Sequence, residues 1–340
     1  MIRPVFLAGL VFALVFSAPA LAQPNEPVQW ITIEGEEGPG KGKHIVFVSG
    51  DEEYRSEEAL PMLAKLLAIR HGFRCTVLFA IDPETGTIDP NHNTNIPGLH
   101  LLGTADLMVL FTRFRELPDD QMKWIVDYTN SGKPIIGLRT ATHAFLYERN
   151  RQSPYAKYSN DSEAPGFEGG YGRQVLGERW VDHHGDHGTE STRGLVNGLL
   201  ADHPILRGVS DVWAPTDVYA VSDITGDEAV LLFGQVLRGM EPTSPPNYDK
   251  SIMPVAWIKT YTGETGQTSR VFTTTMGAAV DFQNEDLRRL IVNAAYWAVG
   301  LEDQIDPDSD VSYVGTYEPT WFGFDGFRTG MRPSDYAYTP

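Results

Sequence analysis

The first part of the chain alternates short apolar runs with longer segments in which apolar residues recur every three or four positions. Short apolar runs are typical of strands buried on both faces, and the recurring pattern is typical of amphipathic helices. The alternation therefore predicts an α/β fold with a doubly wound, mostly parallel sheet flanked by helices. The strands predicted in this part are residues 44–49, 75–79, 107–111 and 134–138.

Capping residues at the ends of the periodic segments support the predicted helices. Ser56 is typical of an N-cap, acidic residues fill the turn after it, and Gly72 is typical of a helix end. Pro118 opens a second helix. Asn284 caps a third helix, in which apolar residues form one face.

The second part of the chain is organised differently. Residues 147–227 are rich in glycine and aromatic residues and have little periodicity, which predicts a long irregular insertion. Strands are expected again at 229–233, 254–259 and 270–275. The aromatic, glycine-rich C-terminal tail is expected to strap the domain or to contact a partner. The predicted boundaries are 1–22 for a signal peptide, 23–42 for a linker, 43–302 for the α/β domain and 303–340 for the tail.

The N-terminus has the pattern of a secretory signal peptide. Arg3 provides a positive charge, an apolar run follows at Val5–Phe16, and Ala20 and Ala22 form a small-x-small cleavage site. The apolar run is too short to span a bilayer comfortably. The pattern predicts a periplasmic or secreted protein whose mature chain begins near Gln23.

Charge and cysteine content limit the partners. The formal net charge is −18, and such an acidic surface repels nucleic acid and anionic lipid, so neither is expected as a partner. No second apolar segment approaches the length of a membrane span. Cys75 is the only cysteine, so the chain cannot form an internal disulfide. A homo-oligomer, or a partner bound through the tail, is compatible with the composition.

Polar side chains follow four of the predicted strands, close to the point where each strand ends; after the last of these strands, 270–275, the polar residue is Asp281. Loops after the carboxyl ends of parallel strands meet at one edge of a sheet, where ligands bind in open α/β folds. Guanidinium and carboxylate groups suit a polyol, and imidazole suits proton transfer. Each charge taken singly fits a solvated loop equally well. The side chains after the other three strands are Asp51, Glu52, Glu53, Arg55, Arg113, Arg115, Arg139, Thr142 and His143.

A second polar cluster lies in the irregular segment. His183, His184 and His187 stand within five residues, with Asp186 between them, and two glycines argue against a regular helix there. The three histidines could hold a divalent metal such as zinc, although no cofactor is required by the pattern. A role in acid/base chemistry or substrate binding, and a plain surface loop, are the alternatives. We expect this loop to fold over the sheet edge that carries His143.

The chain resembles the ThuA-like (trehalose utilisation) family. The resemblance implies a flavodoxin-like fold of the class I glutamine amidotransferase-like superfamily and a link to carbohydrate metabolism. Glutaminase activity does not carry over, because the superfamily's cysteine would lie near Arg139–Ala141 and this chain has none there. The resemblance is carried by GDEEYRSEE at Gly50–Glu58, by Leu117–Phe145, by HHGDHGT at His183–Thr189 and by Gly277–Gly300.

These patterns predict an exported ThuA-like protein that binds and processes a carbohydrate, or an oxidised (keto) sugar derivative, by acid–base chemistry. The alternative is a non-catalytic carbohydrate-binding or scaffold protein on the same fold. The residues expected to act in catalysis are His143, His183, His184, His187 and Glu52. The residues expected to bind substrate are Asp51, Glu53, Arg55, Arg113, Arg115, Arg139, Thr142 and Asp186.

Overall fold

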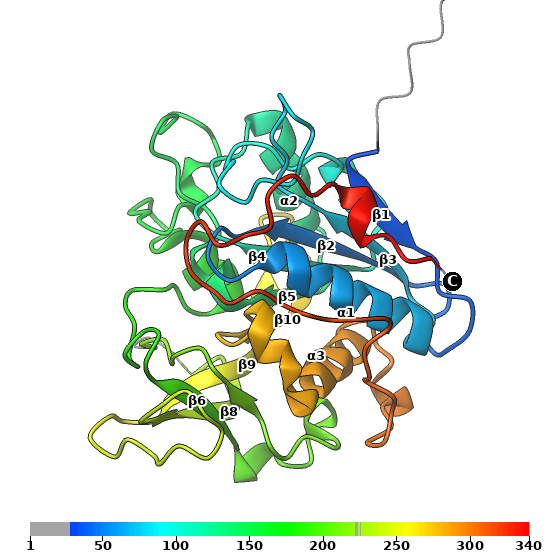
Figure 1. The fold of residues 1–340 in the computed structure, drawn as a ribbon. Coiled ribbons are helices and arrows are strands. Elements are labelled where there is room, and N and C mark those ends of the chain that lie inside the picture. Colours follow the sequence, from blue (N-terminus) through cyan, green and yellow to red (C-terminus); the bar gives the residue numbers. More distant parts are fainter. Residues whose placement is uncertain (1–27, 222–223, 225, 340) are drawn as a thin grey trace, which may run out of the picture.

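Ten strands form one continuous sheet in the computed structural model, which describes residues 28–221, 224 and 226–339 (Figure 1). The predicted signal peptide lies outside the described residues. From edge to edge the strand order is β1-β3-β2-β4-β5-β10-β9-β8-β6-β7. The strands are β1 (Trp30–Ile33), β2 (His44–Gly50), β3 (Arg74–Leu78), β4 (Leu107–Thr112), β5 (Ile135–Leu138), β6 (Ser191–Val196), β7 (Trp213–Ala214), β8 (Ala229–Leu237), β9 (Met253–Thr262) and β10 (Thr268–Thr274).

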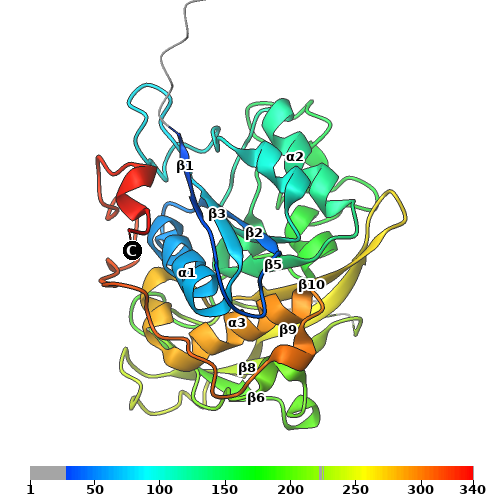
Figure 2. The same cartoon turned by 90° about the vertical axis from the view of Figure 1, so that its right-hand side faces the viewer.

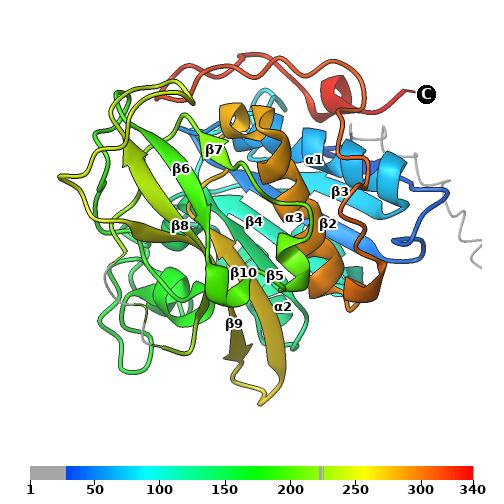
Figure 3. The same cartoon turned by 90° about the horizontal axis from the view of Figure 1, so that it is seen from below.

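The sheet is mixed, which corrects the prediction of a mostly parallel one. Four neighbouring pairs, from β3 through β2, β4 and β5 to β10, are parallel. The other five pairs are antiparallel, and most of them lie at the far end of the sheet (Figure 3). The reason is connection length: β9 and β10 are joined by a short hairpin, whereas a parallel pair needs a crossover of a dozen or more residues.

Helices cover both faces of the parallel part. α1 (Ser56–His71) and α3 (Glu285–Ala298) pack in one core, and α2 (Asp119–Thr129) packs in a second core on the other face (Figure 2). Two predicted caps are present: the Asn284 side chain accepts from the Leu287 N–H at 2.8 Å, and Gly72 ends α1. Ser56 is not the N-cap of α1 but its first helical residue, because its hydroxyl bonds with Ser49 and with the Asp51 N–H. Among the described residues, no helix is both long and apolar enough to cross a membrane.

Shorter helices fill the connections between the strands. The one after β5, Arg139–His143, carries predicted site residues. A single π-helical turn spans Gly172–Leu176. The 3-10 turns are Leu99–Thr104, Arg139–His143, Ala156–Tyr158, Gly198–Leu200, Pro204–Leu206, Ala279–Gln283, Glu302–Gln304 and Pro333–Tyr336.

Three strands lie where the sequence pattern indicated none. β1 lies just after the described chain begins, in the stretch interpreted as a linker, and pairs antiparallel with the edge of β3. β6 and β7 lie in the segment interpreted as an irregular insertion. β1 and β7 are only four and two residues long, so their sequences hold little periodic signal.

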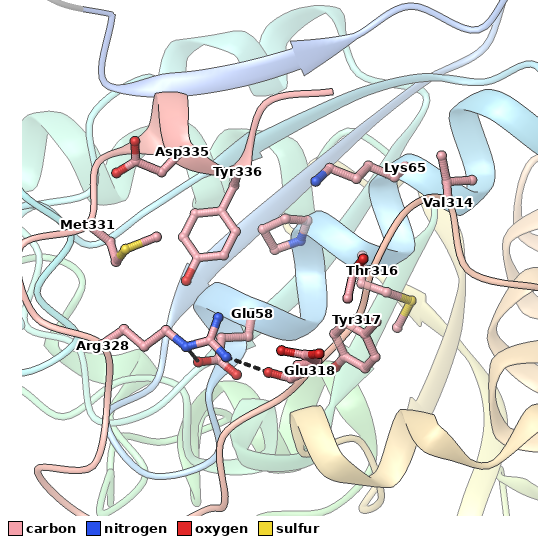
Figure 4. Close-up of a pocket in the computed structure, with 12 residues that line it drawn as sticks. Glu58, Lys65, Val314, Thr316, Tyr317, Glu318, Arg328, Met331, Asp335 and Tyr336 are labelled. Atoms are coloured by element: carbon pink, nitrogen blue, oxygen red, sulfur yellow. Dashed lines mark hydrogen bonds and ion pairs between the residues drawn. The ribbon is translucent and has the colours of Figure 1, made fainter. Parts of the chain in front are cut away.

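The C-terminal segment crosses the outer face of α1 and returns to the β1 edge of the sheet (Figure 1). The Ile88 N–H donates to the Met331 carbonyl at 2.8 Å, and the Thr320 N–H donates to the Glu58 carboxylate at 2.7 Å. Between the segment and α1 lies a groove of about 180 Å³, lined by Lys65, Tyr336 and other residues (Figure 4). None of the predicted site residues lines this groove.

Glu57, in the first turn of α1, gives a testable pH dependence. Its carboxylate is buried and finds no hydrogen-bond partner among the described residues, and burial raises its pKa to about 8. The folded state therefore favours the protonated form, and this contribution to stability is lost as the pH rises from about 4.5 to about 8. We expect Glu57→Gln, which mimics the protonated form, to abolish that loss.

Urea unfolding at pH 5 and at pH 8.5 measures the effect. The variant should match the unmodified protein at pH 5 and exceed it at pH 8.5 by on the order of 4 kcal/mol. Glu84→Gln, at an exposed position, is the control and should change neither value. Parallel pH profiles for the protein and Glu57→Gln would contradict a raised pKa.

Candidate functional site

The loops after β2 and β4 are tied together by a buried ion-pair cluster. The Glu52 carboxylate, after β2, bonds to the guanidinium groups of both Arg113 and Arg115. Burial raises the pKa of Glu52, and the two guanidinium groups oppose that rise. The Phe114 N–H donates to the His143 carbonyl at 2.9 Å, which joins the loop after β5 to the same cluster. The predicted strand-end residues thus come together at one edge of the sheet.

Backbone strain is concentrated at this edge. In the described chain, four non-glycine residues have positive φ angles: Arg55 at 62°, Phe114 at 47°, Arg139 at 45° and Asp325 at 58°. Bulky side chains rarely adopt this conformation, which costs about 1–3 kcal/mol per residue. Three of the four follow β2, β4 and β5, and the fourth belongs to the C-terminal segment. Such strain clusters at functional sites, where surrounding contacts hold it in place.

Arg139 occupies the sharp turn between β5 and the 3-10 helix that follows. Its guanidinium is fully buried between the rings of Tyr54 and Tyr219, at 4.5 and 3.9 Å from their centroids. It donates to the Asp217 carboxylate at 3.0 Å, and to the carbonyls of Asp217 and Thr275 at 2.8 and 2.6 Å. Because these contacts occupy it, Arg139 organises the site from beneath and has little left to offer a substrate.

Asp217 is the residue to which two histidines of the loop are hydrogen-bonded. One carboxylate oxygen lies 2.6 Å from His183 Nδ1, and the other lies 3.1 Å from His187 Nδ1. Burial alone would raise the pKa of Asp217, but the Arg139 guanidinium and the two histidine N–H groups hold it well below the usual range. An ionised Asp217 fixes the proton on Nδ1 of each ring and leaves each Nε2 as the atom available for chemistry.

His143 is packed among aromatic rings next to this loop. Its ring centroid lies 4.9 Å from Phe114, 5.1 Å from Trp180 and 6.1 Å from Tyr219. Burial, with help from nearby Arg113, holds the pKa of His143 well below its usual range. His143 is therefore a neutral imidazole at physiological pH. Trp180 and Tyr219 also contact His183, at 5.7 and 5.5 Å, so the two histidines flank the same pair of rings.

Glu53 links the histidine loop to the ion-pair cluster. Its carboxylate lies 3.5 Å from His187 Nε2 and 3.4 Å from Arg113 Nε. Burial raises the pKa of Glu53 despite the opposing charge of Arg113. This buried carboxyl can therefore exchange a proton more readily near neutral pH than an ordinary glutamate.

Several predicted residues are engaged elsewhere. Asp51 is buried and binds the Glu53 N–H at 2.8 Å, so it shapes its own loop. His184 Nε2 lies 2.8 Å from the Ser251 carbonyl and faces away from Asp217. The remaining contacts of this kind are Arg55 with the Gly323 carbonyl, Arg115 with the Pro90 carbonyl, Thr142 with the Arg139 carbonyl, and Asp186 with Lys250.

A metal could be held by His183, His187 and Asp217, whose ligand atoms lie within 4.8 Å of one another. This replaces the predicted set, because His184 faces away. Zinc bonds of about 2.1 Å place tetrahedral ligand atoms about 3.4 Å apart. The 2.6 Å between His183 Nδ1 and Asp217 is too short for two ligands of one ion and is a hydrogen bond. In this geometry Asp217 orients the two imidazoles through hydrogen bonds.

Asp217 and Tyr219 were not found from the sequence. Each is a single residue in a weakly periodic stretch, and neither follows an apolar run that would mark a strand end. The only local signal is that Asp217 comes three residues after the two-residue strand β7. The predicted loop reaches the edge that carries His143 through His183, which contacts the same rings, Trp180 and Tyr219.

Comparisons with known proteins give one family match and several similar structures. The family model for ThuA, trehalose utilisation, matches residues 44–298. A ThuA-like protein from Parabacteroides merdae is similar in structure with a TM-score of 0.49 at 14% identity, covering 88% of this chain and 100% of its own. A ThuA-like protein from Bacteroides uniformis has a TM-score of 0.45 at 14% identity, covering 80% and 98%. No curated protein matches the chain.

Proposed function

Because this chain belongs to the ThuA (trehalose utilisation) family, we propose that it binds a carbohydrate and processes it by acid–base chemistry. The single observation that carries the proposal is the buried Asp217 carboxylate, which holds two imidazoles beside the neutral His143. A carboxylate that fixes the tautomer of a histidine is the usual way in which a protein prepares Nε2 as a base. His183 and His143 are the pair to which we assign proton transfer.

The substrate class that best suits this pair is an oxidised (keto) sugar derivative. A ketone on a sugar ring acidifies the C–H bond of the neighbouring carbon. His183 Nε2 can accept that proton while a second group donates a proton to the carbonyl oxygen, as paired groups of different pKa do in other enzymes. His143 and Glu53 are positioned for the second step. Covalent acyl transfer is not proposed, because Arg139 occupies the turn where a nucleophile would lie.

Deuterium exchange tests this assignment. We expect the protein, incubated in D₂O with a keto derivative of methyl α-D-glucopyranoside, to catalyse exchange of deuterium into the carbon beside the carbonyl, as followed by NMR. His183→Ala should lose the exchange because the base is removed. His184→Ala, in the same loop but bonded to Ser251, is the matched control and should keep it. Exchange that is equal in all three proteins, or not detected in any, would refute the proposal.

A non-catalytic carbohydrate-binding protein is the second candidate. The observation in its favour is that His143 is only 3% exposed, which limits its direct contact with a ligand. This candidate requires sugar affinity without deuterium exchange or turnover, so the same samples distinguish it when calorimetry is added.

Export is the third part of the proposal. It is supported by the charged, apolar and small-residue pattern of residues 1–22. Mass spectrometry of the protein from fractionated cells tests it: a mature chain beginning near Gln23 outside the cytoplasm is expected, and a full-length cytoplasmic chain would contradict export.

A further inference from the structure

We propose that the C-terminal segment Thr320–Asp325 builds a binding subsite for a second sugar ring at the edge of the histidine site. This segment lies outside the part of the chain that the family model matches. The inference rests on the proposed function and adds to it the size of the substrate: two linked pyranose units instead of one.

The segment is fixed in place by polar contacts with the loop after β2 and with the start of α1. The Gly323 N–H donates to the Glu53 carbonyl at 2.8 Å, and the Gly323 carbonyl accepts from Arg55. The Glu58 carboxylate accepts from the Thr320 N–H and hydroxyl at 2.7 and 2.9 Å. These bonds offset the conformational entropy lost by ordering the segment, so its side chains have defined positions.

Phe322 is the residue through which the segment contacts the histidine loop. It is 7% exposed, stacks on Tyr54 at 5.7 Å, and meets the ring of His187 edge-on at 5.3 Å. On its outer side Trp321 stacks at 5.0 Å. A continuous aromatic stack therefore runs outward from Tyr54, beside the buried Arg139, to the exposed Trp321.

Two large rings of the segment remain open to solvent. Trp321 is 53% exposed and Phe324 is 57% exposed. The Arg113 guanidinium lies 5.0 Å from the ring centroid of Phe324 and 4.8 Å from that of Phe114. Exposing two anchored aromatic side chains within four residues is costly unless a ligand covers them. The Arg113 guanidinium beside Phe324 bonds to the Glu52 carboxylate, and the His187 imidazole contacts Phe322, the ring on which Trp321 stacks.

Exposed aromatic rings next to charged side chains are the combination of groups that recognises a pyranose ring. Such a ring has an apolar C–H face, which packs on an aromatic side chain, and a rim of hydroxyl groups, which bond to charged side chains. Trp321 and Phe324 lie outside the histidine cluster, so they would contact a sugar unit other than the one that reacts. The subsite should therefore favour a disaccharide over a monosaccharide.

Isothermal titration calorimetry with trehalose and with methyl α-D-glucopyranoside tests the subsite. We expect Trp321→Ala and Phe324→Ala each to weaken trehalose binding about five- to tenfold, the loss expected from one aromatic face, and to leave the monosaccharide affinity unchanged. Trp124→Ala, an exposed tryptophan on α2, is the matched control and should change neither affinity. Thermal unfolding of each variant checks that the fold is kept.

The outcomes separate the two proposals. If both sugars bind the unmodified protein equally well and both variants behave like it, the subsite is refuted while the proposed function stands. If neither sugar binds the unmodified protein, the subsite is refuted, while the proposed function is decided separately by the deuterium exchange of the keto sugar. Equal weakening of both sugars would assign the two rings to the reacting unit and would also refute a second-ring subsite.

Discussion

Replacing His143 by Ala should lower the turnover of a keto sugar by roughly 10²–10⁴-fold, the range expected for removal of a general acid or base. Burial and the neighbouring Arg113 keep this imidazole neutral. Its loss therefore cannot be recovered by changing the pH within the physiological range. Sugar affinity should change little, because the groups that we expect to hold hydroxyls remain.

Activity and affinity measured on the same sample decide the role of His143. Circular dichroism must first establish that the variant is folded, because the ring packs against Phe114 and Trp180. His184→Ala is the comparison and should keep full turnover. Unchanged turnover, or equal losses of turnover and affinity, would remove His143 from the catalytic groups and favour the binding-protein alternative.

Replacing Asp217 by Ala should strongly lower the stability of the protein. Arg139 and Asp217 are both fully buried, and removing one partner of such a pair leaves an uncompensated charge in the core. The cost is about 3–5 kcal/mol in the free energy of unfolding. His183 and His187 would lose their common acceptor at the same time, so we expect activity to fall with stability.

Urea unfolding measures this cost, and a second carboxylate in the neighbouring loop provides the control. Asp186 pairs with Lys250 but is 74% exposed, so Asp186→Ala should cost less than about 1 kcal/mol. Asp217→Asn keeps the size and one acceptor of the side chain and should fall between the two. A cost for Asp217→Ala no larger than that for Asp186→Ala would contradict a structural role for the buried pair.

The sequence predicted the parallel part of the fold better than the antiparallel part. β2, β4 and β5 are fully buried along their length, and burial on both faces produces the continuous apolar runs that are easiest to recognise. β6 has buried and partly exposed positions without regular alternation, which resembles a loop. Strand direction is set by which elements meet in space, and the pattern of single residues does not carry that information.

The same limit applies to the site. The strand-end residues Glu52 and Arg113 and the loop histidines were identified because topology alone brings them to one edge. Whether a side chain faces a ligand or its own loop depends on neighbours that are distant in sequence, as the opposite directions of His183 and His184 illustrate. Asp217 carries no pattern at all, although it is the group on which two histidines converge.

The C-terminal segment also determines when the site is completed during synthesis. Arg55 and Gly323 are 268 positions apart, and Glu58 and Thr320 are 262 apart, yet each pair is hydrogen-bonded. A chain leaves the ribosome from its N-terminus, so the parallel strands and α1 can assemble while the aromatic residues near position 322 are still being added. The aromatic contact with His187 is therefore among the last parts to form, and we expect a chain released a few dozen residues early to have its sheet but to lack this contact.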